Sequence, residues 1–74
     1  MRKGYIIWDA NSRRLDIMYQ DGTRYGGLHC GDTLDALIDD RWHSTRVEYR
    51  HSTGTWYLVG VDNDEDLLRL TVRH

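Results

Sequence analysis

The sequence of 74 residues has no proline, no phenylalanine and a single cysteine, Cys30. One cysteine cannot form a disulfide within the chain, so the disulfide framework of small secreted domains is excluded. Long hydrophobic runs are also missing: the apolar run from Tyr5 to Trp8 is shorter than the core of a secretory signal. No stretch approaches the roughly 20 apolar residues of a membrane span. We therefore expect a cytoplasmic protein that does not associate with membranes.

Neither sign of charge is in large excess. Ten Lys and Arg residues stand against 12 Asp and Glu residues, which gives a net charge of −2. Duplex-binding domains usually carry basic charge clustered on one face, so this composition disfavours that class but leaves room for a local basic patch. The chain is 39% hydrophobic and rich in Trp and Tyr, which is too apolar for a disordered segment. Its length predicts one domain over residues 1–74, with a thin core in which aromatic side chains supply much of the burial.

Because proline is absent, turns must be formed by Gly, Asn, Asp and Ser. Such residues recur at short intervals, at 9–12, 20–23, 26–27, 39–40, 51–54 and 61–66. Short strands between frequent turns are typical of an all-β barrel or sandwich. Alternating or β-branched stretches predict strands at 5–8, 14–19, 42–50, 56–61 and 68–73. The first two are expected to form a hairpin. The stretch 56–61 is apolar on both faces, which favours a central strand.

The stretch GDTLDALIDDRW, residues 31–42, fits two structures. Its apolar residues have helical spacing behind an Asp-Thr pair that could cap a first turn. Leu34, Ala36 and Ile38 also fall at alternate positions, as in a half-buried strand. The strand is favoured because acidic residues late in a helix oppose its macrodipole. A strand at 33–39 would then turn tightly at Asp39-Asp40 and pair with 42–50.

Several uncommon residues occur in a characteristic order along most of the chain. The stretch LHCGDTLDALIDDRWHSTRVEYR, followed by WYLVG and LLRLTVR, resembles a family of small bacterial domains of unknown function. The resemblance covers roughly residues 13–73. It implies an all-β fold, a small SH3-like barrel of five to six short antiparallel strands, in an accessory protein with no known activity. The family often has glycine in the turn where this chain has Asp40.

His29 and Cys30 are a candidate catalytic or metal-binding pair. Adjacent residues on a strand point to opposite faces, and no second cysteine stands at metal-ligand spacing. We therefore expect Cys30 to be a small buried hydrophobe at the start of a turn. Gly31 would supply an unusual φ there, and the Asp32 side chain would accept hydrogen bonds from nearby backbone N–H groups.

Other candidate chemistry is weaker. The run 62–66 places aspartates at alternate positions as in a calcium loop, but Leu67 stands where glycine is needed and Arg73 where glutamate is needed. We expect a solvated acidic turn. His43 and His51 would lie about 26 Å apart along a straight strand, too far to share a metal. Since no catalytic spacing is recognisable, we expect no enzyme activity, no cofactor and no metal site.

The aromatic residues are the stronger functional indication. Strand periodicity places Trp42 on the face opposite Val47, and places Trp56 and Tyr57 on opposite faces of their strand. Exposed aromatic residues rimmed by arginine are enriched in protein-binding surfaces. The predicted binding residues are Trp42, Trp56, Tyr25, Arg46 and Arg50.

These observations predict a non-enzymatic protein-interaction module with an unidentified protein partner. Binding would use an aromatic patch or an exposed edge strand. The alternative is a small-barrel nucleic-acid-binding protein, because small barrels often bind nucleic acids. It requires arginines to converge on one side: Arg13, Arg14, Arg24, Arg46, Arg50, Arg69 and Arg73. Exposed edges would also permit self-association, so the predicted state is a monomer or a weak homodimer.

Overall fold

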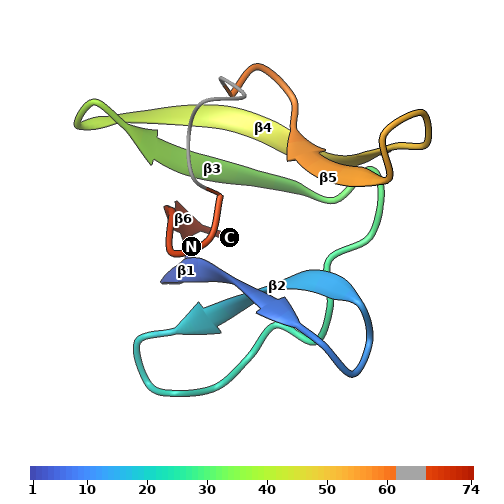
Figure 1. Cartoon of the computed structure of the whole chain (residues 1–74). Helices are drawn as coiled ribbons and strands as arrows, with labels where there is room; N and C mark the ends of the chain where they lie inside the picture. The colour runs from blue at the N-terminus through green and yellow to red at the C-terminus, as the bar shows by residue number, and fades with distance from the viewer. Residues whose placement is uncertain (62–66) are drawn as a thin grey trace.

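Six antiparallel strands make up one sheet, which is curled into a half-barrel (Figure 1). The structure is a computed structural model that describes residues 1–61 and 67–74. No helix occurs in these two ranges, and so none that is long and apolar enough to cross a membrane. The strands are β1 (Lys3–Asp9), β2 (Arg14–Tyr19), β3 (Thr33–Ile38), β4 (Arg41–Arg50), β5 (Thr55–Leu58) and β6 (Thr71–Arg73). The prediction of an all-β fold with five to six short antiparallel strands is confirmed.

The strand order is β2-β1-β6-β3-β4-β5. The β1–β2 hairpin and the β3–β4–β5 meander do not pair with each other directly; β6 lies between them and pairs with both β1 and β3. Figure 1 shows the hairpin below, the meander above and the short β6 between them. The late segment of the chain therefore joins two halves that are built from earlier segments.

The ambiguous stretch is a strand followed by a tight turn. Asp39 and Asp40 both have positive φ, 52° and 63°, and they connect β3 to β4 with Ile38 opposite Arg41. Two consecutive left-handed residues are the geometry of a type I′ hairpin turn, whose twist matches that of the flanking strands. Aspartate tolerates this conformation better than most residues with a side chain. The helical alternative is wrong, and the predicted hairpin is confirmed.

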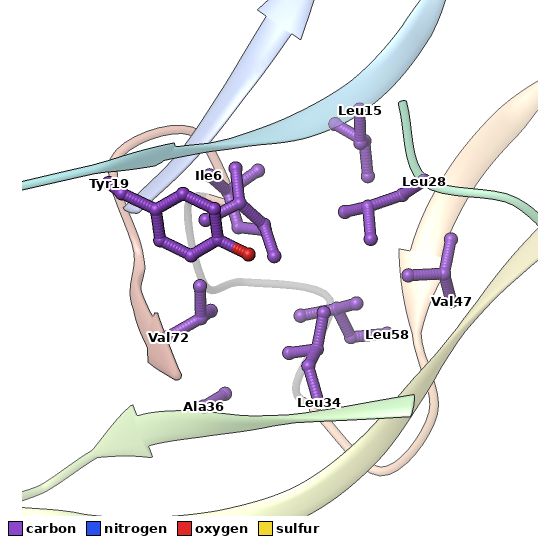
Figure 2. Close-up of a cluster of buried hydrophobic side chains, with 10 residues drawn as sticks. Ile6, Leu15, Tyr19, Leu28, Leu34, Ala36, Val47, Leu58 and Val72 are labelled. Atoms are coloured by element: carbon purple, nitrogen blue, oxygen red, sulfur yellow. The ribbon is translucent and has the colours of Figure 1, made fainter. Parts of the chain in front are cut away.

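The core lies inside the curl of the sheet (Figure 2). Its members are nearly all aliphatic: Ile6, Leu15, Ile17, Tyr19, Leu28, Leu34, Ala36, Val47, Leu58 and Val72. Tyr19 is the one aromatic among them, and burial raises the pKa of its hydroxyl. The expectation that aromatic side chains supply much of the burial is therefore wrong. A narrow half-barrel is filled by branched aliphatic side chains that alternate along each strand, and most of the Trp and Tyr side chains remain outside it.

Two strands differ from their predicted form. β5 ends at Leu58 and lies at the edge of the sheet, not at its centre. The strand stops because the Val61 N–H donates to the Leu58 carbonyl around Gly60, which has a φ of 81°. β6 begins only at Thr71 because the chain before it turns at Arg69, where φ is 71°. The predicted strand at 68–73 is thus half as long as expected.

A buried carboxylate holds the segment that follows β2. Asp16 is only 2% exposed, and its Oδ1 accepts hydrogen bonds from the backbone N–H groups of Ile17, Gly26 and Gly27 at 2.8, 3.0 and 2.9 Å. On either side of these contacts, Tyr25 and Leu28 donate backbone hydrogen bonds to β2. The segment therefore follows the outer edge of β2 and bends around the Asp16 side chain. The two glycines permit the bend, since their φ values are 114° and 104°.

Candidate functional site

The structure brings some of the predicted binding residues together and separates others. Trp42, Arg46 and Arg50 alternate with the inward-facing Val47 and therefore project from the outer face of β4. Trp56 faces inward, because it shares the parity of Leu58 and packs against the core. The two tryptophans thus lie on opposite faces of the sheet and do not form one patch.

The remaining predicted residues have local partners. Tyr25 lies beyond the edge of β2, where its ring meets the ring of His74 edge-on at 4.7 Å. Arg50 stacks its guanidinium on Tyr57 at 4.5 Å. Arg46 is exposed, with its Nε 3.9 Å from a carboxylate oxygen of Glu48. Of the predicted set, Trp42 and Arg46 lie on the same outer face of β4, with Ser44 between them.

The outer face of the sheet carries a row of mainly apolar side chains, with one threonine, that crosses five strands. Strand register places Met18 opposite Tyr5, Tyr5 opposite Thr71, and Leu37 opposite Trp42. The β3–β6 register pairs Ala36 with Val72, so the next step along it brings Leu37 beside Thr71. All five residues have the opposite parity to the core positions of their strands. We call Met18, Tyr5, Thr71, Leu37 and Trp42 the apolar row.

A second row, of charged and polar side chains, runs beside the first. Lys3 lies opposite Arg73, Arg73 opposite Asp35, and Asp35 opposite Ser44. The Arg73 Nε donates to Asp35 Oδ2 at 2.9 Å, and the Ser44 hydroxyl donates to Asp35 Oδ1 at 3.2 Å. We call Lys3, Arg73, Asp35 and Ser44 the charged row. Its side-chain hydrogen bonds connect β4, β3 and β6, in addition to the backbone pairing of these strands.

The charged row also positions Trp42. The Arg73 guanidinium lies 4.3 Å from the centre of the Trp42 ring, within the range of a cation–π contact. Asp35 fixes Arg73 from the other side, and Trp42 remains half-buried. The indole is therefore held in one orientation by an arginine that is itself fixed by a carboxylate.

The predictions about His29 and Cys30 have mixed outcomes. Cys30 is exposed, so the expectation that it is buried is wrong. The reason is a turn: the His29 N–H donates to Asp32 Oδ2 at 2.8 Å, the Asp32 N–H donates to the His29 carbonyl, and Cys30 falls at the tip. The predicted roles of Gly31, with a φ of 91°, and of Asp32 are confirmed. In this tight turn the neighbouring Leu28, not Cys30, enters the core.

Within residues 1–61 and 67–74, no group of three or more His, Cys, Asp or Glu side chains could hold a metal ion. His43 and His51 are both exposed. The calcium-like run at 62–66 lies outside the described residues.

Of the apolar row, the predicted binding residues include only Trp42 and omit Tyr5 and Thr71. They also omit Met18 and Leu37. Periodicity alone places each of them opposite the core positions of its own strand. Their alignment with Tyr5 and Trp42 depends on the insertion of β6 between β1 and β3, which no local pattern reveals.

The comparisons with known proteins identify a family but assign it no activity. The family model described as "Domain of unknown function (DUF5348)" matches residues 4–73. A crystal structure of a protein from the bacterium Ruminococcus gnavus is 37% identical, covers 99% of this chain and 100% of its own, and superposes with a TM-score of 0.85. No curated protein matches the sequence. The resemblance to a bacterial family of unknown function is thereby confirmed, and the chain belongs to the family described as Domain of unknown function (DUF5348).

Proposed function

We propose that this domain is a non-enzymatic protein-binding module and that its partner docks on the outer face of the sheet around Trp42. The observation that carries this proposal is the apolar row. An antiparallel sheet with one face on the core normally presents polar side chains on the other. Here Met18, Tyr5, Leu37 and Trp42 occupy that outer face, and Tyr5 is 40% exposed.

The two rows together have the composition of a binding hot spot. Such hot spots combine aromatic anchors and arginine with a polar surround that excludes water. Trp42 and Tyr5 are the anchors, while Arg73, Arg46 and Lys3 supply positive charge near them. The proposed partner is therefore a protein segment that presents apolar side chains flanked by acidic ones.

Affinity capture tests this proposal. The folded domain is immobilised, lysate of the source cell is passed over it, and a nuclease-treated lysate is run in parallel. We expect one discrete protein to be retained from both lysates. We also expect the Trp42→Ala variant to lose that protein, because the removed indole is the largest apolar group of the row.

Trp8→Ala is the matched control. Trp8 is 46% exposed, but it lies at the end of β1 on the parity of Ile6, away from the apolar row. The control variant should retain the partner. If both variants lose the partner equally, or if circular dichroism shows that Trp42→Ala no longer folds, the assignment of Trp42 to a binding surface is wrong.

The same experiment addresses the nucleic-acid alternative. Several of the arginines that it requires already have partners in the described chain: Arg73 with Asp35, Arg46 with Glu48 and Arg50 on Tyr57. Retention that disappears after nuclease treatment, and that falls steeply with salt, would replace the protein-binding proposal by that alternative.

We further propose that the domain acts in the cytoplasm as a monomer or a weak homodimer. β5 has a single strand neighbour, β4, and edge strands of this kind can pair with a second copy. Sedimentation velocity over a range of protein concentrations measures this directly. A concentration-independent dimer would contradict the proposed state.

A further inference from the structure

A pocket of about 360 Å³ opens on the outer side of β1, at the end of the apolar row farther from Trp42. Its walls come from four places: β1, the residue that follows β2, the turn that leads into β6, and the first residue of β6. The lining residues are Lys3, Gly4, Tyr5, Gln20, Arg69 and Thr71. Among the described residues, the lining contains two cationic side chains and no carboxylate.

Neither cation is neutralised within the described part of the chain. The ion pairs there involve Arg2, His29, Arg46 and Arg73, and neither Lys3 nor Arg69 joins them. A neighbouring recess shares Lys3 and Gln20 with the pocket, but its carboxylate, Asp21, is held by Arg2 at 3.0 Å. The pocket therefore combines two positive charges that form no ion pair with any residue in the ranges 1–61 and 67–74.

The other lining groups can donate hydrogen bonds. Tyr5 and Thr71 carry hydroxyl groups, and Gln20 carries an amide. The Arg69 guanidinium can bind two oxygens of a phosphoryl group at once, while the Lys3 ammonium acts as a point charge. With these hydrogen-bond donors and two cations around one opening, the pocket is complementary to a negatively charged group that accepts hydrogen bonds.

From these observations, we propose that this pocket binds a phosphate monoester. The phosphoryl group would lie between Lys3 and Arg69, and the organic group that it carries would lie over the Tyr5 ring. The volume supports an ester over a bare phosphate ion, because about 360 Å³ falls in the range of small-molecule sites, roughly 300–1,000 Å³.

The test is a titration followed by amide chemical shifts in ¹⁵N–¹H spectra at constant ionic strength. The probes are ribose 5-phosphate, ribose, O-phosphoserine and inorganic phosphate, with sodium chloride as the ionic control. We expect saturable shifts for Gly4, Tyr5, Gln20 and Thr71 with both monoesters and none with ribose. Tighter binding of ribose 5-phosphate would indicate a small-molecule ligand, and tighter binding of O-phosphoserine would indicate a phosphorylated protein segment.

The chain offers a matched pair of variants. Arg69 and Arg13 are both exposed arginines with positive φ, 71° and 55°, so glycine relieves the same backbone strain and removes the same charge at either site. Arg69→Gly should weaken monoester binding at least about tenfold, because a charge-assisted contact is lost. Arg13→Gly should bind as the original protein does.

A second variant, Lys3→Gln, tests the other cation without changing the Arg69 turn, and it should also weaken binding. The proposal fails if the monoesters give no saturable shifts, if inorganic phosphate binds as tightly as both monoesters, or if Arg13→Gly weakens binding as much as Arg69→Gly. The pocket shares Lys3, Tyr5 and Thr71 with the proposed protein-binding surface, but the two proposals are tested separately, since Trp42→Ala should lose the protein partner while leaving monoester binding unchanged.

Discussion

Replacement of Asp16 tests whether one buried carboxylate holds the segment after β2 in place. Three backbone N–H groups converge on its Oδ1, and two of them belong to the buried residues Ile17 and Gly27. In Asp16→Ala those two donors lose their partner. Each unsatisfied buried donor costs about 1–3 kcal/mol, so we expect the free energy of unfolding to fall by about 4 kcal/mol.

Asp16→Asn is the gentler change. The amide oxygen can still accept the three hydrogen bonds, but bonds to a neutral acceptor are roughly half as strong as bonds to a carboxylate. We expect a loss of about 2 kcal/mol. For a domain of this size that corresponds to a lowering of Tm by about 8–16 °C.

These losses are large for this chain. At about 0.05–0.15 kcal/mol per residue, 74 residues give a free energy of unfolding of about 4–11 kcal/mol. Urea unfolding followed by tryptophan fluorescence measures the difference at unchanged m-value. Asp39→Asn is the control, because Asp39 is exposed and the same chemical change there should stay within about 0.5 kcal/mol. A loss below about 1 kcal/mol in Asp16→Ala would refute the reasoning.

Three further changes test other parts of the fold. Asp40→Gly should raise the free energy of unfolding by about 1 kcal/mol in the same urea assay, because glycine adopts a φ of 63° without strain; an unchanged value would contradict the type I′ assignment. Gly4→Ala should lower it by about 2 kcal/mol, because a Cβ at this buried position would clash with the Met18 carbonyl oxygen; a neutral effect would show that β1 and β2 can separate freely there. Hydrogen bonds from Ser12 and Asn11 lower the pKa of Asp9, and those from Thr23 lower the pKa of Asp21, both from 3.8. Their stabilisation is therefore complete above the unfolded-state value and is lost as the pH falls through the lower folded-state values. Thermal unfolding between about pH 2 and pH 5 should show this loss, and Asp9→Asn with Asp21→Asn should reduce its slope; an unaltered slope would contradict the assignment.

Local patterns in the sequence predicted local structure well. Alternation along 33–39 and the Asp39-Asp40 pair were enough to predict the β3–β4 hairpin, because register and turn type are decided within one short stretch. The same alternation correctly placed Trp42 on the face opposite Val47.

Features that depend on distant neighbours could not be predicted in this way. Trp56 and Trp42 lie on opposite faces of the sheet. The apolar strand β5 lies at the edge of the sheet, because strand order follows from how the two halves of the sheet assemble. Asp16 alternates as an outward residue would, yet it is buried by Gly26 and Gly27, ten and eleven residues away. Because every residue except proline has a backbone N–H group, the pattern of residue types does not show that a polar side chain binds such groups and is buried.

The late position of β6 in the chain has a consequence for synthesis. Thr71–Arg73 is the only strand that pairs with both the hairpin and the meander in the described structure, and every other strand precedes it. Once β5 has left the ribosomal exit tunnel, both halves of the sheet are exposed, but the segment that joins them follows later. Until residue 73 leaves the exit tunnel, β1 and β3 each lack a neighbour and can pair with other chains. On a C-terminal linker long enough to span the tunnel, nascent chains that stop before Thr71 should therefore be sensitive to protease, and those that continue through Arg73 should be protected.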